Sequence, residues 1–263
     1  MKKFLVMTDI EGVSAVTSFE IAEKSEFGRE MLMSDLTSVL RGIEDAGCEA
    51  IVYDMHTDGR NVDISKINCP AVLGKPILPE LWRGVGDEID GLFMVGLHTM
   101  QNVPGACLAH SYLREYDEIY INGVLVGEIG VEAALAGERN IPLVFVSGDD
   151  LGCLEAEKLA DGVVTAAVKK SLTENSALCL PISESQKLLY EKALLAAKAD
   201  VKPVKFTPPY EIKIKFSQCY YLNKMKKIHP EIFISDDTVL MKGNNLLKTW
   251  SEYLTYEREM LTE

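Results

Sequence analysis

Four short apolar runs constrain the fold of this chain more than any other sequence feature. They cover residues 4–8, 50–54, 91–97 and 142–147. Each run is apolar at consecutive positions, which is typical of strands that are covered on both faces. An amphipathic pattern over residues 26–46 lies between the first two runs, and Gly47 follows it as a helix-ending residue. The succession of strand, helix and strand predicts an α/β fold with a mostly parallel sheet covered by helices on both faces.

The pattern changes in the middle of the chain. Asn122 and Gly123 lie between apolar flanks in residues 119–128, and this dipeptide predicts a β-hairpin. We expect a short helix to follow and to end near Gly137, and another helix to begin at Asp150. A further helix is expected over residues 184–199, because Ser183 and Gln186 form a capping-box pattern in front of it.

The last part of the chain reads as a separate unit. Pro203, Pro208 and Pro209 interrupt the chain, and residues 210–216 then alternate between polar and apolar side chains as a half-buried strand does. A basic helical turn, a strand over residues 233–241 and a final helix complete a β-α-β-α pattern. We therefore predict an α/β metal-binding catalytic domain over residues 1–202 and a small C-terminal α+β appendage over residues 203–263.

Composition excludes several classes of partner. The net charge of −13 argues against nucleic acid and anionic membranes as partners, since both are negatively charged and bind basic protein surfaces. No segment approaches the roughly 18 consecutive apolar residues of a membrane-spanning helix. The apolar N-terminal run is followed at once by acidic residues, unlike a signal peptide, and none of the cysteines forms a CxxC pair. These features predict a cytoplasmic protein with free thiols.

Asp9 and Glu11 directly follow the first buried run. Residues two apart on an extended chain point to the same side, so both carboxylates can face one point at the carboxyl edge of the sheet. Gly12 allows the backbone to turn away behind them. A solvated acidic loop or a helix cap explains the same pattern almost as well.

Two of the four histidines also follow predicted strands. His56 comes after residues 50–54, and His98 comes after residues 91–97. A single histidine at a strand end is usually a packed residue. Two of them beside two carboxylates predict a metal site, and this mixture of ligands suits zinc, manganese or iron better than magnesium or calcium. Asp54 either accepts the second N–H of the His56 imidazole or makes a simple strand-end turn.

Further acids lie at the same edge of the sheet. Glu128 ends the predicted hairpin between two glycines, which favours a fifth ligand over an ordinary helix-dipole charge. Asp150 is expected to cap the helix that it begins. Asp149 remains a candidate for binding the amino group of a substrate. His229, in a basic stretch, is expected at the surface.

Several strings resemble the zinc-dependent D-aminopeptidase family, and together they cover most of residues 1–175. They are TDIEG, YDMH, VGLHT, PGACLAHS, YINGVLVGEIG, VSGDD and TAAVKKSL. The resemblance implies two zinc ions held by Asp9, Glu11, His56, His98 and Glu128, a catalytic role for His110, and a ring-shaped homo-decamer with an interior chamber. Manganese or cobalt are alternative metals. Met7 departs from the family pattern, which has serine at that position.

The expected function is hydrolysis of short peptides, with a preference for an N-terminal D-amino acid such as D-alanine that only the resemblance implies. A hydroxide held at the binuclear site, with Asp9 as bridging carboxylate, would attack the peptide carbonyl. An aspartate-nucleophile phosphatase using Asp9 is one alternative, although it leaves both strand-end histidines without a role. A non-catalytic, self-assembling metal-binding protein is the other alternative.

Overall fold

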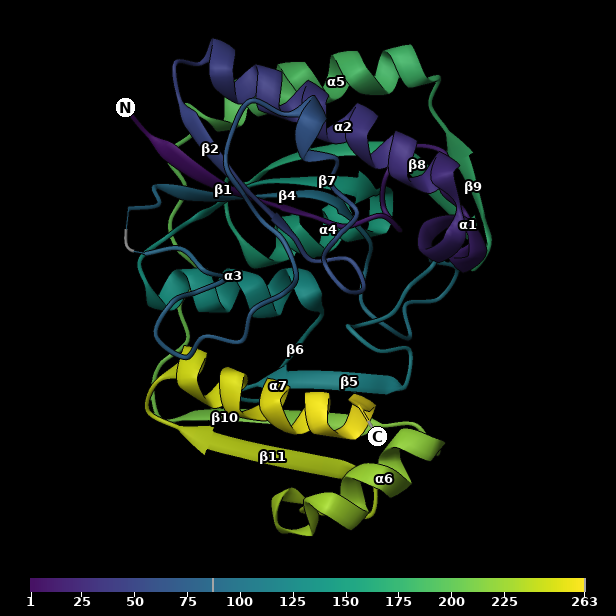
Figure 1. The fold of residues 1–263 in the computed structure, drawn as a ribbon, viewed down its shortest axis with the longest axis vertical. Coiled ribbons are helices and arrows are strands. Elements are labelled where there is room, and N and C mark those ends of the chain that lie inside the picture. Colours follow the sequence, from purple (N-terminus) through teal and green to yellow (C-terminus); the bar gives the residue numbers. More distant parts are fainter. Residues whose placement is uncertain (87, 263) are drawn as a thin grey trace.

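A seven-stranded sheet forms the centre of the computed structural model, which describes residues 1–86 and 88–262 (Figure 1). The strand order is β3-β2-β1-β4-β7-β8-β9. All neighbouring strands are parallel except β9, which runs antiparallel to β8. The strands are β1 (Lys3–Thr8), β2 (Glu49–Asp54), β3 (Ala71–Val72), β4 (Gly91–Leu97), β7 (Leu143–Asp149), β8 (Val164–Thr173) and β9 (Ser176–Cys179).

Helices cover both faces of this sheet, as the apolar runs predicted. One face packs against α2 (Glu26–Asp45) and α5 (Ile182–Ala196), and the opposite face packs against α3 (Glu128–Glu138) and α4 (Asp150–Leu159). Every residue of β4 and β7 is buried. The expected α/β class with a mostly parallel sheet is therefore confirmed. The short α1 (Phe19–Lys24) and the 3₁₀ turn η1 (Ile64–Lys66) lie in the connections.

A second, antiparallel sheet lies beyond α3 in the order β11-β10-β5-β6. The predicted hairpin supplies β5 (Tyr116–Ile121) and β6 (Val124–Val126), and both turn residues, Asn122 and Gly123, have positive φ. The C-terminal segment supplies β10 (Tyr210–Phe216), α6 (Tyr220–Ile228), η2 (Pro230–Ile232), β11 (Thr238–Gly243) and α7 (Leu246–Thr262). The division at residues 202 and 203 stays a prediction, and β10 joins the C-terminal segment to β5 within one sheet.

Two local expectations differ from the structure, and one hairpin was not predicted. Helix α5 begins at Ile182 after Pro181, and no side chain caps its first turn, so Ser183 lies inside the helix and the capping box is wrong. The strand expected over residues 233–241 begins only at Thr238, because η2 and a bend precede it. The hairpin of β8 and β9 was not expected from the residue pattern.

Close backbone contacts bring the ends of the central strands together. A Cβ atom at Gly12 would lie 2.0 Å from the carbonyl oxygen of Leu97, and one at Gly148 would lie 1.7 Å from the same atom. Only glycine permits these approaches. They place the loop after β1 and the end of β7 directly against the end of β4.

None of the described helices has the combination of length and apolar composition that crossing a membrane requires.

Candidate metal centre

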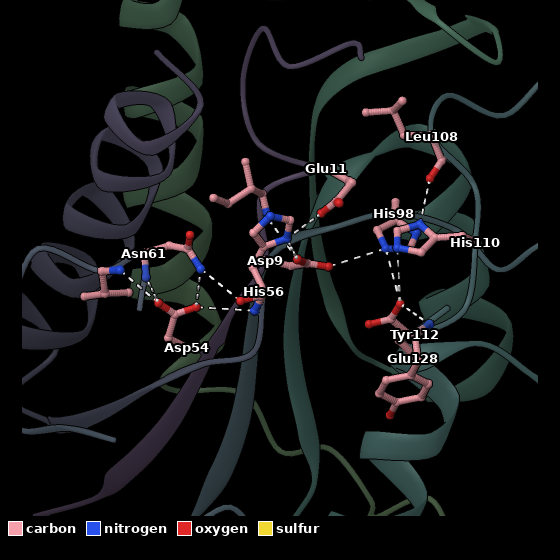
Figure 2. A network of polar contacts seen from close by, with 12 residues as sticks. Asp9, Glu11, Asp54, His56, Asn61, His98, Leu108, His110, Tyr112 and Glu128 are labelled. Carbon is pink, nitrogen blue, oxygen red and sulfur yellow. Dashed lines mark hydrogen bonds and ion pairs between the residues drawn. The ribbon is translucent and has the colours of Figure 1, made fainter. Parts of the chain in front are cut away.

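All five predicted ligands lie in one buried cluster at the carboxyl edge of the central sheet (Figure 2). Asp9 and Glu11 follow β1, His56 follows β2, and His98 follows β4. Because β1 lies between β2 and β4, the two imidazoles flank the carboxylate of Asp9. Glu128 reaches the cluster from another direction as the first residue of α3.

The two oxygen atoms of Asp9 face different histidines. Oδ1 lies 2.9 Å from Nδ1 of His56, whereas Oδ2 lies 3.4 Å from Nε2 of His98. Nδ1 of His56 also lies 3.0 Å from Oε2 of Glu11, and Nε2 of His98 lies 3.5 Å from Oε1 of Glu128. Asp9 is thus the shared member of two neighbouring groups of possible ligands.

These groups are compact enough to hold metal ions. One set of atoms within 4.8 Å of each other comes from Asp9, Glu11 and His56, here called the first trio. A second such set comes from His98, His110 and Glu128, here called the second trio. Two ligands that are each about 2.0–2.1 Å from a tetrahedral zinc ion lie roughly 3.4 Å apart. The distances around Asp9 are close to this value.

An unpartnered polar atom also fits a cation at this place. Nε2 of His56 is buried and has no hydrogen-bond partner among the described residues, whereas Oε2 of Glu11 and Nε2 of His98 meet only other members of the cluster. Buried polar atoms are normally paired, so the free nitrogen of His56 needs an explanation. A mixed set of imidazole and carboxylate ligands suits zinc and similar transition metals.

Backbone carbonyls fix the two stacked imidazoles of the second trio. Nδ1 of His98 lies 3.0 Å from the carbonyl oxygen of Thr99, and Nδ1 of His110 lies 3.0 Å from that of Leu108. Each Nδ1 therefore carries a proton, and Nε2 is the nitrogen that faces the carboxylates of the cluster. The two rings stack with centroids 4.0 Å apart, and Nε2 of His110 lies 3.9 Å from Oε1 of Glu128.

Electrostatics inside the cluster favour the ionised carboxylates. Burial disfavours the charge of Asp9, but hydrogen bonds and charges from His56 and His98 hold the pKa of this carboxyl well below its usual range. Burial alone would lower the pKa of His56, whereas Asp9 and Glu11 raise it to about 10. The pKa of His98 is likewise raised well above its usual value by Asp9 and Glu128 against the effect of burial.

His110 differs from the other two histidines of the cluster. Burial and the neighbouring charge of His98 lower the pKa of His110, and the nearby carboxylates only partly offset this. The residue is 9% exposed, and its imidazole makes an edge contact with Phe19 at 5.4 Å between ring centroids. His110 therefore combines a neutral ring with a place at the wall of the cleft described below.

The two auxiliary aspartates bind backbone N–H groups: Asp54 makes the strand-end turn, one of its two expected roles, and Asp149 takes the helix cap that was expected of Asp150. Asp54 does not contact the His56 imidazole. Its carboxylate instead accepts the backbone N–H of His56 at 3.3 Å and that of Val62 at 2.9 Å, which holds the loop behind the ligand. Asp149, rather than Asp150, caps α4 by accepting the N–H groups of Leu151 and Gly152, each at 2.9 Å. Asp149 is fully buried and does not line the cleft, so its expected contact with the amino group of a substrate gains no support.

Several supporting residues had no signal in the sequence. The backbone N–H of Tyr112 donates to Oε1 of Glu128 at 2.6 Å. Glu155 of α4 accepts the hydroxyl of Thr99 at 2.9 Å and the N–H of Met100 at 2.8 Å, which fixes the chain after His98. These contacts join residues distant in sequence, so no local pattern could indicate them.

A cleft of about 590 Å³ opens onto the cluster. Five members of the cluster line it, namely Asp9, Glu11, His56, His110 and Glu128. Residues of α7 line it as well, among them Leu254, Glu257 and Arg258. The cleft can therefore bring a small polar ligand to the cluster.

Cation binding should displace protons from this site. A ligating histidine must be neutral, and both His56 and His98 have raised pKa values in the metal-free protein. We expect zinc binding at about pH 7 to release about one proton or more per ion, and its apparent affinity to rise with pH. Calorimetry in two buffers of different ionisation enthalpy measures this release, and equal heats in both buffers would contradict it. His229→Ala is the control, since His229 pairs with Glu231 and Glu259 outside the cluster.

Comparison with known proteins identifies the family of this chain. The family model described as D-aminopeptidase matches residues 1–253. The D-aminopeptidase of Bacillus subtilis (strain 168) is 28% identical over 264 residues, which cover 96% of this chain and 95% of that protein. A solved structure is also similar, that of the Zn-dependent D-aminopeptidase DppA from Bacillus subtilis, a self-compartmentalizing protease. The two structures superpose with a TM-score of 0.90 over 99% of this chain and 98% of that one, and the sequences are 26% identical. The chain therefore belongs to the D-aminopeptidase family and is a hydrolase of the metallo-aminopeptidase type.

Proposed function

We propose that this enzyme removes an N-terminal D-amino acid, such as D-alanine, from short peptides at a centre of two zinc ions. Asp9, Glu11 and His56 would hold one ion, and His98 and Glu128 would hold the other, with Asp9 shared between them. The opposed contacts of the two Asp9 oxygens with His56 and His98 carry this proposal. Zinc and the D-configuration are supported by the solved relative, which is a Zn-dependent D-aminopeptidase.

The ligand residues and His110 would divide the chemistry between them. A divalent cation bound by such residues lowers the pKa of water and polarises a carbonyl group. The carboxylates of Asp9, Glu11 and Glu128 balance the positive charge. His110, with its Nε2 lone pair at the cleft wall, would accept a proton and pass it to the leaving amine.

The size and lining of the cleft support a short peptide as the substrate. Its volume of about 590 Å³ lies in the usual range for small-molecule sites. Carboxylates of Glu23, Glu115 and Glu257 line it together with several basic side chains, so both charged ends of a small peptide can find partners.

The alternative functions gain no support. An aspartate-nucleophile phosphatase needs Asp9 to face its substrate, but both Asp9 oxygens face imidazoles. A non-catalytic assembly would leave the cleft and the neutral ring of His110 without a role. We keep the cytoplasm as the proposed location because all six cysteines are free thiols, as in reducing compartments.

A peptide screen tests the proposed reaction. We expect the zinc-loaded enzyme to release the first residue of D-alanyl dipeptides and tripeptides, and to act far more slowly on the L-alanyl isomers and on N-acetylated peptides. The same panel with manganese and cobalt identifies the preferred metal. An aryl phosphate serves as the control substrate, and its hydrolysis at a rate above that of the peptides would contradict the proposal.

His110→Ala should separate proton transfer from metal binding. We expect the variant to keep its zinc but to lose about 10²–10⁴-fold in kcat, the usual contribution of a general acid–base group. Bound metal and peptide turnover are to be measured on the same sample, with His229→Ala as the matched control. Loss of one ion together with activity would make His110 a ligand of the second trio, and near-normal turnover would remove it from the mechanism.

We further propose that the enzyme is a homo-oligomer, specifically a decamer. The support is the solved relative, a self-compartmentalizing protease that matches this chain over nearly its whole length. Light scattering at micromolar concentration should give a mass of about ten chains in a closed ring. A stable species of 29.1 kDa would end this proposal.

A further inference from the structure

Lys169 is a buried cation directly behind the first trio. It lies in β8, on the opposite side of the loop that follows β1, and it is only 2% exposed. Its Nζ donates to the backbone carbonyl oxygens of Glu11, Val13 and Val16, with 3.1 Å to Val13. Lysine is almost never this deeply buried without a specific partner, so its three contacts require a reason.

The number of contacts matches the ammonium group. A lysine ammonium has three N–H donors and no acceptor, and it meets three carbonyl acceptors here. A neutral amine would have one donor too few for this arrangement. Three backbone carbonyl oxygens therefore surround the ammonium group and accept all of its N–H bonds.

The contact with Glu11 distinguishes Lys169 from the other groups that hold this loop. Asp9 is held by the central sheet, because its N–H donates to the carbonyl oxygen of Val95 at 2.9 Å. Asp35 holds Ser14 further along, through the backbone N–H at 2.8 Å and the hydroxyl at 2.9 Å. Lys169 alone among these three binds the backbone of the ligand Glu11 itself.

We propose that Lys169 is a positioning residue for Glu11. Its ammonium fixes the carbonyls of the loop, holds the Glu11 carboxylate against His56, and thereby sets the cation affinity of the first trio. The second trio belongs to other loops and is independent of this contact. The inference rests on the proposed metal ligands.

The test compares cation binding in matched variants. Lys169→Met removes the ammonium but keeps the length of the side chain, and Lys170→Met is the control because Lys170 is the exposed neighbour on the same strand. Competition with a chromophoric chelator measures the affinities for zinc and cobalt. We expect Lys169→Met to lower the affinity for one of the two ions by about 10–100-fold, as is usual for residues that orient metal ligands. Lys170→Met should bind both ions as tightly as the wild type.

Glu11→Gln identifies which ion is affected. It should lower the affinity for the same ion as Lys169→Met does, and the cobalt absorption spectrum should change in the same way in both variants. If the wild type binds only one ion, the two-ion proposal fails. The role of Lys169 is then decided by whether both variants lower the affinity for that one ion. Wild-type affinity for every ion in Lys169→Met would overturn the inference.

Chemical rescue tests whether the lost cation affinity depends on the ammonium group or only on the packing of the side chain. Lys169→Ala removes Cγ, Cδ, Cε and Nζ, and n-propylammonium supplies the same atoms. Millimolar n-propylammonium should restore the lost affinity in Lys169→Ala and leave Glu11→Gln unchanged. Equal losses at both trios, or misfolding of Lys169→Met without rescue of Lys169→Ala, would reduce Lys169 to a packing residue and overturn the proposal.

Discussion

The carboxylate of Asp9 between two imidazoles is the interaction on which the rest of the site depends. It exists because β1 lies between β2 and β4, so that the strand-end histidines reach Asp9 from opposite sides. Three carboxylates and three imidazoles are buried together here. Burial of so many ionisable groups is costly unless they are paired, and a shared carboxylate allows each group to find an opposite charge or a cation.

A second set of contacts holds these ligands from behind. Asp54 fixes the loop that carries His56, Glu155 fixes the chain after His98, and the N–H of Tyr112 fixes Glu128. Asp54 and Glu155 bind the backbone of the loops that carry His56 and His98, so these loops remain ordered while both imidazoles stay available to a cation. The N–H of Tyr112 instead orients the Glu128 carboxylate directly.

The sequence predicted which residues meet in the cluster better than it predicted the contacts that support them. Asp9, Glu11, His56 and His98 all follow buried apolar runs, and the rule that parallel strands end at one sheet edge was enough to bring them together. The supports depend on tertiary contacts instead. Asp54 and Asp149 were recognised as functional candidates, but whether a carboxylate meets an imidazole or a backbone N–H depends on loop conformations that residue spacing does not determine.

The same distinction explains the differences in the fold. Strands that are buried on both faces have a continuous apolar pattern, so β1, β2, β4 and β7 were clear. In β8 a buried lysine interrupts the apolar pattern, and its partners lie more than 150 residues earlier in the chain. Pro181 already fixes the backbone at the start of α5, so the pattern around Ser183 was not needed as a cap.

The C-terminal segment is connected to the candidate metal centre through Tyr112. The ring of Tyr112 packs on Trp250 of α7 with 5.3 Å between centroids, while its backbone N–H binds Glu128, one of the proposed ligands. Farther along α7, the hydroxyl of Tyr253 donates to that of Tyr116 at 2.6 Å, and Tyr116 donates to Glu257 at the cleft wall, also at 2.6 Å. A displacement of α7 would therefore change both the wall of the cleft and the support of Glu128. The second sheet, which anchors α7 beside β5, is in this sense part of the active-site architecture even though it supplies no ligand of either trio.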